Sequence, residues 1–380
     1  MGVPHFYKYI TTRHKQALRA VLPGPCDALM VDLNCAVHRC AEAVLNAAFM
    51  KALCAGLKRS QAALVLLAGC AVHISDSCEP GEGEHKIFSR INSCQQQLER
   101  VVVYGADADL IMLSMRSSAK YPFVMREDQV RTELPAESYQ FIDIDLLRHR
   151  VTHLMGSANE FVVMCMLLGN DFIPPLSFLR VRERGIELLM EKYNHLRRQA
   201  IDRGGAFQLL QKDSTTITTT TTTSLDSASL VLLIEAVSAN ENEAFFYIDA
   251  AYTEARKQCS FSGPFSRTPW VRTMEACDTS KILAGGDGWR PRYYTSLFPT
   301  STDMSKLCER YVQGLAWTVA YYFDYEKSKA RVSDWYYPYS YSPTSLDLAN
   351  YLRLLGVDKF KEPEARDHEL HHVRINVLNK

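Results

Sequence analysis

Residues 101–115 read VVVYGADADLIMLSM, and this stretch decides the fold. Its β-branched start, with little polar alternation, predicts a strand buried on both faces, as in a parallel sheet. Gly105 ends the strand, and the segment from Asp109 to Met115 predicts a short helix. Asp107 and Asp109 therefore follow the carboxyl end of a strand, where ligands bind in open α/β sheets.

The rest of the first half repeats this alternation. Three more apolar runs predict strands, and they are Ala28–Asn34, Ala62–Gly69 and Cys70–Ser75. The intervening stretch Gly83–Leu98 predicts a helix with one apolar face, formed by Ile87, Ile91, Cys94 and Leu98. Strands alternating with helices predict an α/β fold, with a parallel or mixed sheet flanked by helices.

From Phe141 onward the pattern becomes mainly helical. Glu160–Gly169 predicts a buried helix and Arg182–Tyr193 an amphipathic one, whereas the threonine tract Thr215–Ser224 predicts a surface loop. The last part of the chain is rich in aromatic residues. We therefore expect three regions: a core at 1–200, a low-complexity linker or loop at 201–228, and a helical, aromatic-rich region at 229–380.

Composition excludes several classes of protein. The 43 basic and 43 acidic side chains balance, which argues against a protein that coats nucleic acid nonspecifically. Eleven cysteines without a CxxC pair predict reduced thiols rather than a zinc site. The longest apolar run, Ala62–Val72, is shorter than the ~20 residues that span a bilayer, and the start of the chain has no apolar signal core. We expect an intracellular protein with no membrane partner, in either nucleus or cytoplasm.

Carboxylates recur at the ends of these predicted elements. They are Asp32, Glu82, Glu84, Asp107, Asp109 and Asp171. Converging carboxylates repel one another, and divalent cations with a preference for oxygen ligands, such as Mg²⁺ or Mn²⁺, relieve the repulsion. Each acid also has an ordinary structural interpretation as a helix or turn cap, or as the partner of a basic side chain. Taken together, the acids favour metal binding.

Several motifs resemble the 5′→3′ exoribonucleases of the XRN type. PGEGEHKI (Pro80–Ile87) is the most specific match, and YGADADLIMLSM and LLGNDFIPPL follow in the order of that family. The opening MGVPHFYKYI, the segment VDLNCAVHRC and the downstream GWRPRYY, YVQGLAW and DWYYPYSYSP segments match as well. The resemblance runs from Met1 to about Leu352, with gaps.

The resemblance implies a fold related to the PIN and flap-endonuclease nucleases. It implies hydrolysis of single-stranded RNA from a free 5′ end to nucleoside 5′-monophosphates, in RNA decay or processing, and two Mg²⁺ or Mn²⁺ ions held by the six acids named above. It also implies that His38 contacts the terminal base, and Trp335 is a candidate for a second stacking face. The alternatives are a hydrogen-bonded helix residue for His38 and core packing for Trp335.

The chain departs from the family in two places. Ala68 stands where the family has a further metal-binding aspartate, and the basic helix that grips the 5′-monophosphate has no counterpart between Gly69 and Glu82. Lys58 and Arg59 precede the strand and do not replace that helix. Three interpretations follow: a divergent active nuclease, a catalytically impaired RNA-binding or scaffold relative, or a sequence from which an internal segment has been lost. A flap nuclease acting on DNA ranks last, because PGEGEH and the aromatic region point to RNA.

Overall fold

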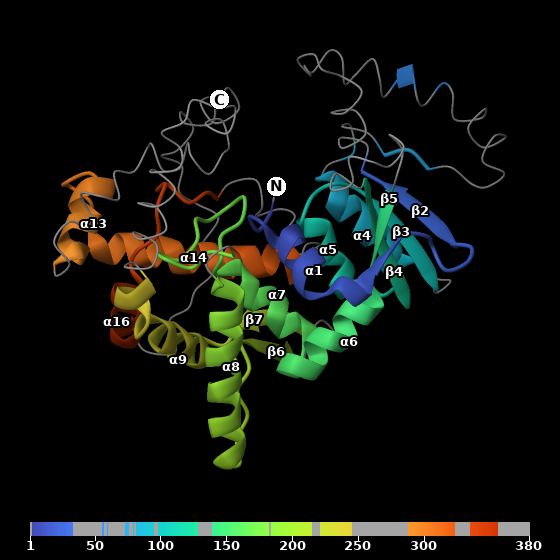
Figure 1. The fold of residues 1–380 in the computed structure, drawn as a ribbon. Helices are drawn as coiled ribbons and strands as arrows, with labels where there is room; N and C mark the ends of the chain where they lie inside the picture. The colour runs from blue at the N-terminus through green and yellow to red at the C-terminus, as the bar shows by residue number, and fades with distance from the viewer. Residues whose placement is uncertain are drawn as a thin grey trace, which may run out of the picture. The chain divides into compact units, whose positions relative to one another are not determined.

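The computed structural model describes a set of separate ranges of the chain. They are residues 2–32, 55–56, 59, 73–75, 79, 81–94, 98–127, 139–181, 184–214, 221–244, 288–323 and 335–355. The chain forms two compact units, Tyr7–Ala158 and Met1–Phe6 together with Asn159–Lys380 (Figure 1). This division by compactness does not test the three regions expected from sequence, which stay predictions. The expected strand at Ala62–Gly69 lies outside the described residues, and the described part of Cys70–Ser75 is not a strand.

A mixed sheet is the centre of the unit Tyr7–Ala158. Its five described strands run in the order β1-β5-β4-β3-β2, with bounds Leu18–Arg19, Tyr139–Asp143, Tyr121–Glu127, Arg100–Tyr104 and Ala28–Val31. β2, β3 and β4 are parallel, whereas β5 is antiparallel to both β4 and β1. The α/β fold with a mixed sheet is thereby confirmed.

The two strands that precede the predicted acids differ in burial. Val101, Val102 and Val103 of β3 are buried, as their sequence predicts. In β2, however, Leu29 and Val31 are 57% and 44% exposed. β2 is the last strand of the described sheet and its alternate side chains face outward, so the expectation of burial on both faces is wrong for this strand.

Four helices and one 3-10 helix accompany this sheet among the described residues. They are α1 (Phe6–Arg13), the 3-10 helix η1 (Lys15–Ala17), α4 (Gly83–Ser93), α5 (Asp109–Arg116) and α6 (Ile144–Met155). α5 and α6 pack against β4 and against each other (Figure 1). α4 ends at Ser93, so Cys94 and Leu98 lie beyond it. Its buried residues are His85, Phe88 and Ile91, and the predicted apolar face is corrected accordingly.

The second unit is mainly helical, as expected. Its helices are α7 (Ala158–Met166), α8 (Gly185–Asp202), α9 (Ser227–Ser238), α13 (Trp289–Leu297), α14 (Met304–Phe323) and α16 (Ser345–Leu355). The predicted buried helix corresponds to α7, in which Glu160 through Met166 are all buried. α9 packs against α8 and α16, and α14 packs against α16. Within the part of the chain that the structure describes, none of the helices has both the length and the apolar character needed to cross a membrane.

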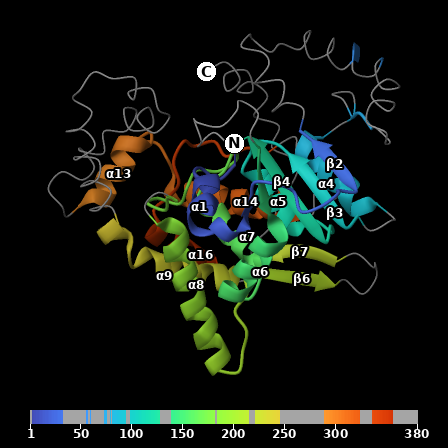
Figure 2. The ribbon, with the colours of Figure 1, turned by 45° about the vertical axis from the view of Figure 1, so that its right-hand side comes forward.

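The threonine tract contributes a strand. β7 (Thr221–Leu225) pairs antiparallel with β6 (Leu210–Ser214), and Figure 2 shows the two arrows side by side. Threonine is β-branched and favours extended backbone, and a partner strand supplies the backbone hydrogen bonds. The prediction of a loop is therefore wrong for the end of the tract, where Leu225 is buried.

Candidate metal centre

Asp32 lies where the sheet meets the start of α4. Its backbone N–H donates to the carbonyl of Tyr104 at 3.0 Å, so the chain leaves β2 directly beside the end of β3. A Cβ atom added to Gly83, the first residue of α4, would lie 3.6 Å from Asp32 Oδ1. The carboxylate of Asp32 therefore faces the amino end of α4.

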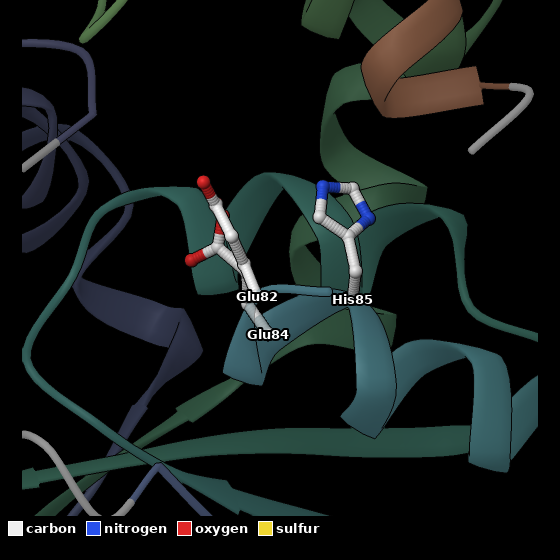
Figure 3. Close-up of side chains that lie close together, drawn as sticks. All are labelled: Glu82, Glu84 and His85. Atoms are coloured by element: carbon white, nitrogen blue, oxygen red, sulfur yellow. The ribbon is translucent and has the colours of Figure 1, made fainter. Parts of the chain in front are cut away.

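Three potential ligands gather at that helix end. One ligand atom each from Glu82, Glu84 and His85 lies within 4.8 Å of the other two (Figure 3). Glu82 is exposed, Glu84 is half-buried and His85 is buried. Glu82 occupies the N-cap position of α4 without a side-chain capping bond, so a helix cap does not account for its carboxylate.

His85 was missed in the sequence analysis. It directly follows Glu84 in GEGEH, and its closeness to both glutamates is a property of the folded helix end. Burial, followed by the positive charge of Arg116, lowers the pKa of His85 from 6.5 to about 3. The imidazole is therefore neutral near pH 7, which is the form that binds metals.

Asp107 and Asp109 follow β3 at the same edge of the sheet. Asp107 is half-buried, and Asp109 is 4% exposed and opens α5. Gly105 permits this tight passage, because a Cβ atom there would lie 2.2 Å from Leu110 Cδ1 and 3.5 Å from Asp32 Cβ. The ends of β2 and β3 thus carry Asp32, Asp107 and Asp109 at one edge of the sheet, as their positions along the strands predict.

Asp171 belongs to the other compact unit, in the loop after α7. Its Oδ1 accepts a hydrogen bond from the Gly2 N–H at 3.0 Å. The turn itself is capped by Asn170, whose Oδ1 accepts from the N–H groups of Phe172 and Ile173 at 2.9 and 3.0 Å. The alternative role as a turn cap therefore falls to Asn170. That Asp171 joins the acids of the other unit stays a prediction from the family resemblance.

Of the two residues predicted to contact RNA, the structure describes only Trp335. His38 lies outside the described residues, as does Ala68. Trp335 is half-buried and stacks on Trp317, with ring centroids 5.6 Å apart and planes inclined by 29°. One face of Trp335 is thus engaged in packing, and its contact with a base stays a prediction.

The chemistry of these residues fits a divalent cation. Carboxylate oxygens are the ligands that Mg²⁺ and Mn²⁺ prefer, and a nearby neutral imidazole adds a nitrogen donor suited to a transition metal. Glu82, Glu84 and His85 could hold such an ion, and Asp32 faces the same helix end. These acids lie at the carboxyl edge of the parallel strands β2 and β3, which is where ligands bind in open α/β sheets.

Comparison with known families identifies the chain more closely. The model of the XRN 5′-3′ exonuclease N-terminus matches residues 46–128, and the model of the Xrn1 helical domain matches residues 157–264 and 271–362. Because the second model alone covers more than half of the 380 residues, the chain belongs to the XRN family of 5′-3′ exoribonucleases.

Curated relatives agree with this assignment at low identity. The chain is 22% identical to the 5′-3′ exoribonuclease 2 homolog of Drosophila melanogaster and 24% identical to 5′-3′ exoribonuclease 2 of Gallus gallus. These matches cover 74% and 73% of the chain and 40% of each relative, so the chain spans about two fifths of their length. A shorter match, 32% identical over 33% of the chain, is to 5′-3′ exoribonuclease 2 of Yarrowia lipolytica.

Proposed function

We propose that this protein is a metal-dependent 5′→3′ exoribonuclease, which hydrolyses single-stranded RNA to nucleoside 5′-monophosphates. The observation that carries the proposal is the gathering of Glu82, Glu84 and His85 at the amino end of α4, facing Asp32, in a chain of the XRN family. Asp107 and Asp109 at the same sheet edge complete the acids that this unit contributes. Asp171 is the sixth acid that we assign to the site.

The roles of the residues follow from their chemistry. The carboxylates would hold two Mg²⁺ or Mn²⁺ ions, which when bound supply Lewis acidity toward the phosphate and lower the pKa of an attacking water. The buried Asp109 fixes one carboxylate rigidly, whereas the exposed Glu82 leaves its carboxylate accessible to substrate. Neutral His85 adds a donor without adding positive charge. His38 and Trp335 would stack on bases of the RNA.

The test is degradation of 5′-monophosphorylated single-stranded RNA by purified protein with Mg²⁺ or Mn²⁺. We expect mononucleotide release, with Asp107→Asn lowering the rate by about 10²-fold or more because a ligand is lost. Asp145→Asn is the matched control, because Asp145 follows β5 at the opposite end of the sheet and lines a small cavity with Arg100 and Tyr121. Equal loss in both variants would argue against a site at the carboxyl edge.

A catalytically impaired RNA-binding or scaffold relative is the alternative, favoured by Ala68 and the missing basic helix. The alignment with the Drosophila relative runs over 382 positions yet covers only 74% of this chain, so that relative has segments within the aligned region without a counterpart here. Mn²⁺-dependent thermal stabilisation separates the two functions. The nuclease should melt at a higher temperature with Mn²⁺, and Asp171→Ala should reduce that shift, whereas a scaffold should bind RNA without any shift.

A further inference from the structure

The loop that carries Asp171 is unusually well fixed for a loop. Gly169 has a φ of +82°, and a Cβ atom there would lie 2.6 Å from the Pro175 nitrogen, so the chain folds tightly back on itself. The N–H of Leu176 donates to the carbonyl of Leu167 at 2.9 Å and closes the loop. Pro174 and Pro175 restrict the backbone further. A displacement at one end of this loop is therefore transmitted to the other.

The far end of the loop is fixed by a buried carboxylate, Glu241. Ser177 has a φ of +34°, which is unfavourable for a residue with a side chain. Its hydroxyl donates to Glu241 Oε1 at 2.7 Å, and its N–H donates to Ser342 Oγ at 2.7 Å. Glu241 is 0% exposed and also accepts from the N–H of Ser345 at 2.6 Å. One carboxylate thus joins the loop to the first residue of α16.

The charge of Glu241 is compensated within the same network. Its Oε2 lies 3.3 Å from Arg290 Nη2, in the GWRPRYY segment, and it also accepts from the N–H of Leu346 at 3.4 Å. A buried charge persists only when it is paired and hydrogen-bonded, so these partners are needed together. The network therefore links Ser177 with α13 and α16, two helices of the aromatic-rich region.

Aromatic residues of α14 hold the middle of the loop. Tyr311 donates its hydroxyl to the carbonyl of Pro174 at 3.1 Å. Phe172, the residue after Asp171, packs edge-on against Trp317 and Tyr321, with centroids 4.7 Å away in each case. Gly314 leaves room for Ile173, since a Cβ atom there would lie 2.6 Å from Ile173 Cγ2. These contacts come from α14, downstream of residue 240, whereas the Asp171 carboxylate itself accepts from the N–H of Gly2.

We propose that Glu241 is a positioning residue for Asp171. Through Ser177 and the closed loop it fixes the backbone that presents the Asp171 carboxylate, and the aromatic-rich region serves the site by holding this loop. The inference deepens the proposed function, since Asp171 matters to catalysis only if that function is correct. Hydrogen exchange reports on the loop without any RNA cleavage. The positioning role of Glu241 and the nuclease function can therefore be refuted independently.

The test is amide hydrogen exchange in the peptide spanning residues 167–179. Glu241→Gln keeps the shape of the side chain but replaces one accepting oxygen by an NH2 donor. That oxygen is either Oε2, to which Arg290 and the Leu346 N–H donate, or Oε1, to which the Ser177 hydroxyl and the Ser345 N–H donate. We expect exchange of this peptide to accelerate by about 10-fold or more, and the Mn²⁺ concentration at half-maximal thermal stabilisation to rise by about 10-fold. If the wild type cleaves RNA, kcat should fall by about 10²-fold with little change in KM.

Glu160→Gln is the matched control. Glu160 is also a buried carboxylate of this unit, and it accepts from the N–H groups of Leu209 and Leu210 at 2.6 and 3.1 Å and from Tyr193. It should lower global stability without selectively accelerating the loop. Equal acceleration in both variants, or none in Glu241→Gln, would overturn the proposal. If Glu241→Gln does not fold, Ser177→Ala removes the same link and should accelerate the same peptide.

Discussion

Gly105 sets how closely the end of β3 and the start of α5 approach each other. Its backbone does not require glycine through a positive φ, but a Cβ atom would lie 2.2 Å from the tip of Leu110, which is fully buried. We expect Gly105→Ala to lower the free energy of unfolding by about 1–3 kcal/mol, because a packed core resists an added methyl group. Denaturant unfolding measures this change.

Gly205→Ala is the comparison for that variant. A Cβ atom at Gly205 would lie 3.5 Å from its nearest neighbour, the Ala200 carbonyl oxygen, which is an ordinary contact. Its unfolding free energy should therefore change by less than about 0.5 kcal/mol. If the two glycine variants were equally stable, the close approach of Leu110 to Gly105 would be incorrect.

His14 makes the fold sensitive to acid. It is 3% exposed, and neither ring nitrogen has a hydrogen-bond partner among the described residues. Burial, followed by the charge of Arg150, lowers the pKa of His14 from 6.5 to about 4. Between these values the unfolded chain binds a proton that the folded chain does not, so stability falls as pH falls. The loss from pH 7 to pH 5 should be roughly 2 kcal/mol.

Replacing His14 by phenylalanine tests this pH dependence. The His14 ring packs edge-on against Tyr9 at 5.5 Å, and a phenylalanine ring preserves such packing without titrating. Unfolding free energies measured at pH 7 and pH 5 should differ by roughly 2 kcal/mol less in His14→Phe than in the wild type. A slope unaltered by His14→Phe would assign the acid sensitivity to other groups.

At the scale of elements, one arginine joins α6 to the end of α5. Arg148 Nε donates to the Met115 carbonyl at 2.9 Å, and Nη2 donates to the Ser114 and Ser117 carbonyls at 2.7 and 2.9 Å. These carbonyls lie at the end of α5, where an α-helix runs out of its own backbone donors, although that of Ser114 also accepts from the Ser117 N–H at 3.2 Å. Since α5 begins with Asp109, this anchor also fixes the helix that opens with a candidate ligand.

Arg148→Lys should therefore be far from conservative. A lysine ammonium cannot match the planar fork that reaches several carbonyls, and the carbonyls left without donors are costly. We expect a loss of about 2–3 kcal/mol in the free energy of unfolding, from chemical denaturation. In the matched variant Arg150→Lys, the original guanidinium donates to the Gln16 side chain, and a change below about 0.5 kcal/mol is expected. Similar losses in the two variants would contradict the anchoring role of Arg148.

The local pattern of apolar residues correctly predicted those elements whose burial follows from their own sequence. β3 and α7 follow from apolar runs that end near Gly105 and Gly169, and α5 follows from the apolar run after Asp109. The threonine tract was misjudged because composition indicated a loop, whereas β7 depends on its partner β6. For α4, the helical period was correct, but Phe88 and His85 are buried by tertiary packing that the sequence period alone cannot reveal. His85 entered the candidate site for the same reason.

At the scale of the whole molecule, the chain keeps the six acids and the contacts around Asp171, whereas its sequence between Gly69 and Glu82 contains no lysine or arginine. The six acids and the downstream aromatic segments all lie in the chain, whereas the sequence predicts no counterpart of the basic helix between Gly69 and Glu82. Removing a group that binds the 5′-monophosphate should weaken selection of the RNA end more than the hydrolytic step. A net charge of zero gives the chain no general attraction for RNA that would compensate.

Two RNA substrates that differ only at the 5′ end test whether hydrolysis persists without selection of the 5′-monophosphate. With Mn²⁺, kcat/KM for 5′-monophosphorylated and 5′-hydroxyl RNA should differ by less than about 10-fold, because the sequence between Gly69 and Glu82 lacks the basic residues that would add the ~1.4 kcal/mol a larger preference requires. Inserting a segment of basic helix before Pro80 should raise activity only on the monophosphorylated RNA. A strong preference in the unmodified protein would mean that other basic residues grip the phosphate. Arg→Gln variants across the chain, screened for loss of that preference alone, would then locate them.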